Sequence, residues 1–432
     1  MSRFVNVGVI GFGTIGSGVV KVLSLKSGLL KDKLGLSINL CAVCDLDIES
    51  DRGVVVDSSI LTTDIDSVLN DGKIDIIVEL IGGVTIAKDI ILKALNNKKH
   101  VVTANKALLA EAGKEIFQAA RDNGVDVFYE ASVGGGIPII RSLTQGLAAD
   151  TVESVYAIIN GTSNYILSQM SQKGCDFKIA LREAQKKGYA ESDPTLDING
   201  VDSAHKIAIL ARICFGREVN FSDIYVEGIE NIELSDIHYA DEMGYCIKLL
   251  AIAKRLDNGA QVRVHPTLLP KKHLLANVNG VYNAILLNSD FVGEELLHGP
   301  GAGQLPTASA VVSDIIDIGQ RISENNRLNS STVNISSEHL EIQSIDNMQA
   351  RYYIRFSASD EPAVLSQIAA ILGKNNISIY SVIQKGRRLD QAVHVVMMTH
   401  EAKESDVAKA LSEINGLGVI KKKSVAIRTE RI

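Results

Sequence analysis

The sequence lacks the long apolar segment that a membrane-spanning helix needs. No run of about 18 consecutive apolar residues occurs anywhere in its 432 residues. The first residues, MSRFVNVGVIGFG, also lack the basic flank, apolar stretch and small-residue cleavage site of a secretory signal. These absences predict a soluble, cytoplasmic protein that does not bind membranes.

Blocks of like charge are absent as well. Lysine and arginine number 44 against 51 aspartates and glutamates, which gives a formal net charge of −7, and no segment is rich in lysine or arginine. Nucleic-acid-binding domains usually carry a concentrated basic patch. The sequence therefore predicts no nucleic-acid partner.

Cysteine is scarce and scattered. Five cysteines, an odd number, are spread along the chain, which excludes a disulfide framework and is typical of a reducing compartment. Cys41 and Cys44 form a C-x-x-C, but they lie in the strand-like run INLCAVCD with no second Cys or His pair nearby. We therefore expect small buried hydrophobic side chains here and no metal or redox site.

The length of the chain predicts two to four domains. In residues 1–130, apolar strand-like runs such as IDIIVELIG alternate with helical stretches. This alternation, with strands apolar along their whole length, is typical of βαβ units in a parallel sheet covered on both faces. The predicted fold class is α/β, with a Rossmann-type doubly wound parallel sheet in this first domain.

Three further segments follow. Residues 131–304 read as a second α/β domain, and an amphipathic helix over about 305–322, with Thr307 placed to cap it, is expected to rejoin the first domain. The polar, Ser/Asn-rich stretch 325–348 has the composition of a linker. Residues 349–432 give a β-α-β-β-α-β order, which predicts a ferredoxin-like sandwich.

A glycine motif follows the first predicted strand and opens the first predicted helix. In VNVGVIGFGTIGSGV, G-x-G-x-x-G is formed by Gly11, Gly13 and Gly16. In this context the three glycines permit a tight turn, a close approach of the backbone to a pyrophosphate, and close helix–strand packing. The sequence therefore predicts a dinucleotide site, and the loop residues expected to contact the cofactor are Gly11, Phe12, Gly13, Thr14, Ile15 and Gly16.

Asp45 ends the second predicted strand and could bind the ribose hydroxyls. It lies 29 residues after Gly16, beyond the usual ~20, and the stretch KSGLLKDKLG explains the excess as a longer connection. A carboxylate here favours NAD, because it would repel the additional phosphate of NADP. Lys106 follows another strand, at the edge of the sheet where ligands bind. It could face the nicotinamide or the substrate, or it could be an ordinary surface lysine.

The stretch AESDPTLDINGVDSAHKIAILARICFG combines an acidic loop with an apolar helix that should begin near Val201. Asp202 and Lys206 are spaced i, i+4 and project from one helix face, either as a solvated pair or as a buried one. The apolar residues that follow Lys206 favour burial. A shielded lysine held by a carboxylate can exchange a proton with an alcohol or a carbonyl. His205 points about 100° away around the helix and is the weaker candidate base.

YEASVGGGIPIIRSL reads as a strand, a glycine turn and a helix. Its backbone amides and carbonyls could face a substrate or a monovalent cation, or the glycines could simply form a turn.

Taken together, these motifs resemble the homoserine dehydrogenase family. The resemblance covers most of residues 5–320 and rests on GFGTIGSGVV, ELIGG, TANKALLA, YEASVGGGIPII, NGTSNYIL, GYAESDPTLDINGVDSAHK and GPGAGQLPTASAVVSD. It implies NAD(P)-dependent interconversion of L-homoserine and L-aspartate 4-semialdehyde, on the route to threonine, isoleucine and methionine. Residues 131–304 would then be the catalytic, substrate-binding and dimerisation domain.

The resemblance assigns roles position by position. Lys206 matches the family's proton-transferring lysine and Asp202 its partner. The implied substrate-binding residues are Glu191, Asp197, Gly188, Tyr189, Gly161 and Thr162. Lys106 and Gly303 are implied in the cofactor cleft. A sodium ion would be ringed by Glu130 and the carbonyls of Val133, Gly135 and Ile137.

One departure from the family concerns the cofactor. Many relatives carry an arginine that can meet the NADP phosphate where this sequence has Cys44. Its absence agrees with the preference for NAD over NADP inferred from Asp45.

The C-terminal segment resembles an ACT domain, which implies an amino-acid effector such as threonine. Ala363 occupies the position where relatives usually have the glycine that meets the effector's carboxylate. The resemblance also implies a homodimer or homotetramer, paired through the second domain, the ACT domain or both.

Two alternatives are considered, one from another class of protein and one within the oxidoreductases. A non-catalytic sensor that binds dinucleotide and amino acid would be favoured if the active-site lysine or acid were missing, but both are present. An aspartate-semialdehyde dehydrogenase would need an activated nucleophilic cysteine, and none of the five cysteines lies beside a conspicuous loop histidine.

Overall fold

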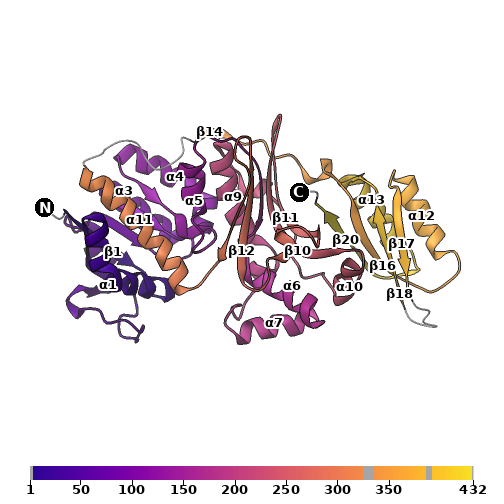
Figure 1. Ribbon diagram of the computed structural model, residues 1–432, viewed down its shortest axis with the longest axis horizontal. Helices are drawn as coiled ribbons and strands as arrows, with labels where there is room; N and C mark the ends of the chain where they lie inside the picture. The colour runs from indigo at the N-terminus through magenta and orange to yellow at the C-terminus, as the bar shows by residue number, and fades with distance from the viewer. Residues whose placement is uncertain (1–2, 325–334, 386–391, 431) are drawn as a thin grey trace. The chain divides into compact units, whose positions relative to one another are not determined.

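The computed structural model describes residues 3–324, 335–385, 392–430 and 432. It divides by contacts into two compact units (Figure 1). The described parts of Met1–Val155, His205–Ser222 and Tyr282–Leu340 form the first unit. The second comprises the described parts of Tyr156–Ala204, Asp223–Val281 and Glu341–Ile432.

A six-stranded sheet in the order β3-β2-β1-β4-β5-β6 organises the first unit. All of its strand pairs are parallel. At its centre, β4 is buried along its whole length, and β1 is buried from Val7 to Ile10. The Rossmann-type sheet predicted from the sequence is thereby confirmed. Its strands are β1 (Arg3–Ile10), β2 (Leu36–Cys44), β3 (Leu61–Thr62), β4 (Ile76–Glu79), β5 (His100–Thr103) and β6 (Val127–Phe128).

Helices join these strands, and one returns from late in the chain. α11 packs against α1 and β1 (Figure 1), and it adds Val311, Ile315 and Ile318 to the core formed by Val7 and Val19. α11 is thus part of the core of the first unit. The helices are α1 (Thr14–Leu34), α2 (Ile65–Asn70), α3 (Thr85–Asn96), α4 (Lys106–Asn123), α5 (Ile139–Arg141) and α11 (Gln304–Glu324).

The start of α11 differs from the prediction. The helix begins at Gln304, and the Thr307 amide donates to the Gly303 carbonyl at 3.2 Å. Thr307 therefore lies inside the first turn, and its expected role as the cap is wrong. Gly303, at φ +115°, turns the chain early, and Pro306 is tolerated in the first helical turn because no intrahelical donor is lost there.

The remaining elements of the first unit are further strands, together with part of one strand and part of one helix that the second unit shares. β12 and β13 pair antiparallel, and β14 lies parallel to β8. These elements are β8 (Arg217–Glu218), β12 (Tyr282–Ser289), β13 (Gly293–Pro300) and β14 (Ser336–His339). α9 (Val201–Phe215) and β7 (Val152–Ile158) supply residues to both units.

The second unit has adjacent strands in the order β10-β11-β20-β16-β18-β17, with β9 beside β11. The strands of this unit are β9 (Tyr225–Val226), β10 (Tyr245–Leu256), β11 (Gly259–Pro270), β15 (Gln349–Ala350), β16 (Tyr352–Ala358), β17 (Ile379–Gln384), β18 (Val393–Thr399), β19 (Ala402–Lys403) and β20 (Ile420–Thr429). Its helices are α6 (Gly161–Lys173), α7 (Phe177–Lys186), α8 (Thr195–Ile198), α10 (Leu234–Glu242), α12 (Val364–Lys374) and α13 (Glu404–Asn415).

The C-terminal segment has the predicted β-α-β-β-α-β order. It runs β16, α12, β17, β18, α13, β20, and its strands pair antiparallel. Residues of α12 and α13 form one core with β16 and β18. The ferredoxin-like sandwich is therefore confirmed.

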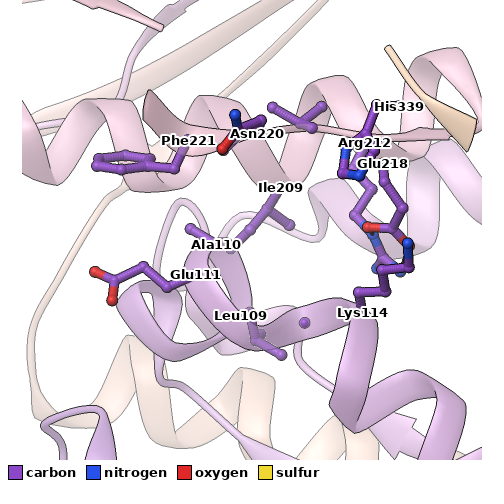
Figure 2. A pocket seen from close by; sticks show the side chains of 13 residues that line it. Leu109, Ala110, Glu111, Lys114, Ile209, Arg212, Glu218, Asn220, Phe221 and His339 are labelled. Atoms are coloured by element: carbon purple, nitrogen blue, oxygen red, sulfur yellow. Dashed lines mark hydrogen bonds and ion pairs between the residues drawn. The ribbon is translucent and has the colours of Figure 1, made fainter. Parts of the chain in front are cut away.

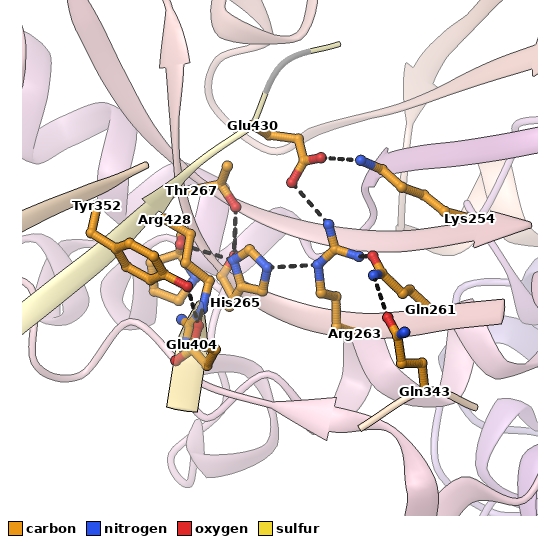
Figure 3. A network of polar contacts seen from close by, with 11 residues as sticks. Lys254, Gln261, Arg263, His265, Thr267, Gln343, Tyr352, Glu404, Arg428 and Glu430 are labelled. Atoms are coloured by element: carbon orange, nitrogen blue, oxygen red, sulfur yellow. Dashed lines mark hydrogen bonds and ion pairs between the residues drawn. The ribbon is translucent and has the colours of Figure 1, made fainter. Parts of the chain in front are cut away.

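The last strand also joins this sandwich to the strands before it. β20 runs parallel to β11, with Arg428 opposite Thr267. A buried polar network follows this seam (Figure 3). In it, Arg428 donates to Glu404 at 2.5 and 2.7 Å, and Arg263 donates to Glu430 at 2.9 Å. The C-terminal module is thus built into the second unit.

Part of the predicted linker, residues 325–334, lies outside the described residues. The described remainder is hydrogen-bonded: the Leu340 amide donates to the Glu218 carbonyl in the first unit, and the Ala260 amide donates to the Glu341 carbonyl in the second. The predicted domain limits themselves remain predictions. Among the described helices, none is both long and apolar enough to span a bilayer.

Candidate active site

The glycine loop has the geometry that its motif predicts. A Cβ on Gly11, at φ +99°, would lie 2.6 Å from the Leu80 carbonyl carbon, and a Cβ on Gly16 would lie 1.9 Å from the Gly11 carbonyl oxygen. Both positions therefore require glycine, for the turn and for close packing. A Cβ on Gly13 would meet nothing within 4 Å, so the loop is open at the position where a pyrophosphate approaches.

The start of α1 completes this cradle. Thr14 and Ile15 begin the helix, and its N-cap Gly13 provides no side-chain cap. The N–H groups of a helix's first turn and its dipole favour an anion. The residues present therefore fit a dinucleotide.

Asp45 lies against the loop. Its carboxylate accepts a hydrogen bond from the Phe12 amide at 2.5 Å and another from the Asp47 amide at 3.0 Å. Neighbouring Cys44 is buried, and burial raises the pKa of its thiol to about 11, so this cysteine is inert at neutral pH. Within the described residues, no group of three or more His, Cys, Asp or Glu side chains could hold a metal ion.

Replacing Gly16 with alanine should abolish tight dinucleotide binding. The new Cβ would overlap the Gly11 carbonyl and push the loop away from α1. We expect the dissociation constant for the dinucleotide, measured by calorimetry, to rise at least about 100-fold.

Gly28→Ala is the matched control on the same helix, because a Cβ there meets nothing within 4 Å. It should leave binding unchanged and stabilise α1 by about 0.5–1 kcal/mol. Normal dinucleotide affinity in the Gly16 variant would contradict this account of the loop.

A second loop cluster lies at the same edge of the sheet. Buried Glu79, at the end of β4, accepts hydrogen bonds from the Thr103 hydroxyl at 2.7 Å and the Ile81 amide at 2.9 Å. Asn105 caps α4 and donates to the Gly83 carbonyl at 2.6 Å. Burial raises the pKa of Glu79. This cluster fixes the turn that presents Lys106, the first residue of α4, at the carboxyl end of β5.

The start of α6 forms part of the predicted substrate site. Gly161 begins the helix, and a Cβ there would lie 2.8 Å from the Val281 carbonyl oxygen, so only glycine fits. The Thr162 hydroxyl donates to the Tyr189 carbonyl at 2.6 Å. The predicted residues Gly161, Thr162 and Tyr189 are thereby brought together, and Gly188, at φ +72°, turns the chain into this contact.

Asn160, which the sequence analysis missed, organises the acidic residues. Its Nδ2 donates to the Asp197 carboxylate at 2.7 Å and to the Asp202 carboxylate at 2.9 Å. Both predicted acids therefore meet at one side chain. Glu191 lies in the loop between α7 and α8. Its backbone carbonyl accepts a hydrogen bond from the Gln185 side chain at 3.2 Å, and its side chain is exposed.

α9 carries the predicted catalytic pair. It begins at Val201 as expected, and Asp202 and Lys206 lie one turn apart in it. Both are buried, with exposed fractions of 6% and 9%, which excludes the alternative of a solvated pair. The His205 ring stacks on Phe221 with centroids 4.6 Å apart, and its Nε2 lies 3.6 Å from a Glu111 carboxylate oxygen.

The predicted cation loop is held by α11. The Glu130 amide donates to buried Asp314 at 2.9 Å, and Arg141 pairs with Asp317 at 2.6 Å. The Glu130 carboxylate accepts from the Ile140 and Arg141 amides, both at 2.8 Å. Burial raises the pKa values of Glu130 and Asp314.

The glycine turn of this loop allows a close backbone approach. Gly134 and Gly135 have φ values of +73° and +59°. A Cβ on Gly135 would lie 2.6 Å from the Gly301 backbone. Val133 and Ile137, which flank the turn, are buried. An all-oxygen set of backbone carbonyls suits a hard cation.

A separate cavity of about 310 Å³ lies in the first unit between α4, α9 and the segment after β8 (Figure 2). Arg212 and Glu218 form a buried bidentate pair in its lining, at 2.8 and 2.9 Å. Lys114 and His339 also line it. No residue predicted for the active site lines this cavity.

Comparison with known families and proteins shows to which family a chain with these features belongs. The model described as homoserine dehydrogenase matches residues 138–316, and that of the homoserine dehydrogenase NAD binding domain matches 11–130. The ACT domain model matches 352–419. A homoserine dehydrogenase from Neisseria gonorrhoeae is 45% identical over 431 residues, which cover 99% of each chain. The chain belongs to the homoserine dehydrogenase family.

Solved structures of this family agree with the fold. A homoserine dehydrogenase from Thiobacillus denitrificans has a TM-score of 0.93 at 41% identity, over 99% of this chain and 98% of that one. A hyperthermophilic archaeal homoserine dehydrogenase in complex with NADPH has a TM-score of 0.62 at 27% identity, over 73% of this chain and 98% of that one. The predictions of family, fold class and a nicotinamide-dinucleotide-dependent oxidoreductase are confirmed.

Two residues that the sequence analysis missed had a readable signal. Asn160 stands directly before a predicted helix in NGTSN, the place of an N-cap, and Glu79 ends an apolar strand in ELIGG. Asp314 had none, because its partner, the Glu130 amide, is 184 residues away in the chain.

Proposed function

We propose that the chain interconverts L-homoserine and L-aspartate 4-semialdehyde, with Lys206 exchanging the proton of the substrate oxygen. The observation that carries this proposal is the burial of Lys206 one helical turn after buried Asp202. A lysine held in a buried site can exchange a proton with the oxygen of a bound substrate.

The proposed substrate contacts come from α8, from the loop before it and from the start of α6. Asp197 and Glu191 provide carboxylates for the ammonium of homoserine, and Gly188 and Tyr189 lie in the same loop as Glu191. The backbone of Gly161 and Thr162, at the N-terminus of α6, suits the substrate's carboxylate. Fixing both ends of a small amino alcohol orients its carbinol group, and such orientation accounts for much of the rate of a bound reaction.

The nicotinamide dinucleotide, when bound, supplies the acceptance or donation of hydride. Gly11, Phe12, Gly13, Thr14, Ile15 and Gly16 would hold its pyrophosphate, Lys106 and Gly303 would line its cleft, and Asp45 would bind its ribose. Lys206 takes the hydroxyl proton in oxidation and returns it in reduction.

NAD is the proposed physiological cofactor. Asp45 lies beside the Phe12 amide, where its negative charge would repel a phosphate on the ribose. Replacing Asp45 with serine should raise kcat/KM with NADP relative to that with NAD by about 10- to 100-fold. Asp47→Ser, two residues away on an exposed turn, is the control. An unchanged ratio in the Asp45 variant would argue against this role.

Other proposals rest on the family resemblance. They are a sodium ion ringed by Glu130 and the carbonyls of Val133, Gly135 and Ile137, an amino-acid effector such as threonine at the ACT domain, a homodimer or homotetramer, and a cytoplasmic location.

The direct assay follows nicotinamide absorbance with L-homoserine and NAD, and then with NADP. Turnover that depends on homoserine supports the proposal. Dinucleotide binding without turnover with either cofactor would refute it.

A further inference from the structure

Asn160 uses its carboxamide in three directions at once. Its Nδ2 donates to Asp197 Oδ1 at 2.7 Å and to Asp202 Oδ2 at 2.9 Å. Its Oδ1 accepts from the Ser163 amide at 2.8 Å and so caps α6. Since both amide hydrogens and the oxygen are engaged, the side chain has one orientation, and it is 4% exposed.

The arrangement brings two carboxylates to the same nitrogen. Two carboxylates this close repel each other, and a donor shared between them offsets that repulsion. Serine and aspartate would also cap a helix, but neither could cap it and donate to both acids. Asparagine therefore does something at this position that the N-cap role alone does not require.

The two acids serve different parts of the proposed reaction. Asp197 binds the substrate's ammonium, and Asp202 lies one turn before Lys206 on α9. We propose that Asn160 is a positioning residue that fixes the spacing of Asp197 and Asp202. It thereby fixes the position of the group that binds the substrate's ammonium relative to the group that lies beside the proton-exchanging lysine. This inference rests on the proposed function.

Two variants separate the bridge from the cap. Asn160→Ser keeps a capping oxygen and removes both donated bonds without adding charge, whereas Asn160→Asp keeps the shape and the cap but places a third carboxylate beside the other two. In both, kcat/KM for L-homoserine should fall about 100-fold, the penalty typical of misplaced groups. KM for homoserine should rise and kcat should fall, while KM for the dinucleotide changes less than about twofold.

The pH dependence gives a readout that a purely structural cap would not move. The groups facing Asn160 are Asp197 from α8 and Asp202 from α9, with Lys206 one turn beyond. In Asn160→Asp, the three carboxylates raise one another's pKa, so the acid limb of kcat/KM should move to higher pH. Thermal stability of this variant should recover as pH falls from 8 towards 5, because the folded state then binds more protons than the unfolded state. Asn160→Ser should show no such recovery.

Asn123→Asp is the matched control. Asn123, at the end of α4, donates to the Ala119 carbonyl at 2.9 Å and touches neither Asp197 nor Asp202. The kinetic constants of this variant should therefore equal those of the unsubstituted chain. If both Asn160 variants keep the kinetic constants and pH profile, or merely yield less folded enzyme with unchanged constants, the inference is overturned. An unsubstituted chain without homoserine turnover would instead refute the proposed function, and the pH dependence of stability would still decide whether Asn160 bridges the two acids.

Discussion

Replacing Lys206 with methionine is expected to lower kcat for homoserine oxidation by about 10²–10⁴-fold, the range that a positioned acid or base contributes. Lys206 is 9% exposed and lies in a helix that is apolar around it. Methionine fills a similar volume but cannot take up the hydroxyl proton. The loss should therefore appear in kcat measured by nicotinamide absorbance, with little change in dinucleotide affinity.

Lys114→Met is the matched control for this prediction. Lys114 is exposed on α4 and lines the separate cavity of the first unit (Figure 2). Its replacement should leave kcat unchanged. A Lys206→Met enzyme that turns over at the rate of the unsubstituted chain would remove Lys206 from the mechanism.

Replacing Asp236 with alanine should destabilise the second unit by about 3 kcal/mol, because it leaves the buried Arg355 guanidinium with only the half-exposed Glu233 carboxylate, 3.3 Å away, as an ionic partner. Asp236 is fully buried and accepts hydrogen bonds from Arg355 at 2.6 and 3.1 Å and from the Tyr353 hydroxyl at 2.8 Å. Arg355 is 1% exposed, so its guanidinium would have no access to water. Thermal unfolding of the unit should shift down by on the order of 10 °C.

Asp241→Ala tests a carboxylate on the same helix that pairs at the surface. Its bond to Lys271 is 2.6 Å long, but the two side chains are 61% and 47% exposed. Its loss should cost less than about 1 kcal/mol. Equal destabilisation by the two variants would mean that burial does not determine the energy of the Asp236 cluster.

The sequence predicts the fold well where the pattern is local. The glycine motif, the apolar strands of the first sheet and the order of the C-terminal sandwich each follow from residues close together in the chain. The pairing of β20 with β11 could not be predicted, because it joins segments about 160 residues apart through a buried ionic seam (Figure 3). Non-local pairing leaves no periodicity in the sequence.

The candidate site likewise has a part that the local sequence predicts and a part that it does not. The i, i+4 spacing of Asp202 and Lys206 predicts a shared helix face, and α9 has it. The bridge from Asn160 to Asp197 and Asp202 spans 37 and 42 residues, and only the folded structure, in which α6 packs against α8, reveals it. Thr307 shows an error in the other direction, because the local pattern predicted a helix cap that the structure does not have. Gly303 turns the chain earlier, so that Thr307 lies inside the helix.

The central claim, hydride removal from the carbinol carbon of homoserine, is tested most directly by isotope transfer. The full chain is incubated with NAD and L-homoserine in which both hydrogens of the carbinol carbon are replaced by deuterium, and the reduced cofactor is analysed by mass spectrometry. The account predicts one deuterium in each reduced nicotinamide. Reduced cofactor that contains no deuterium would contradict it.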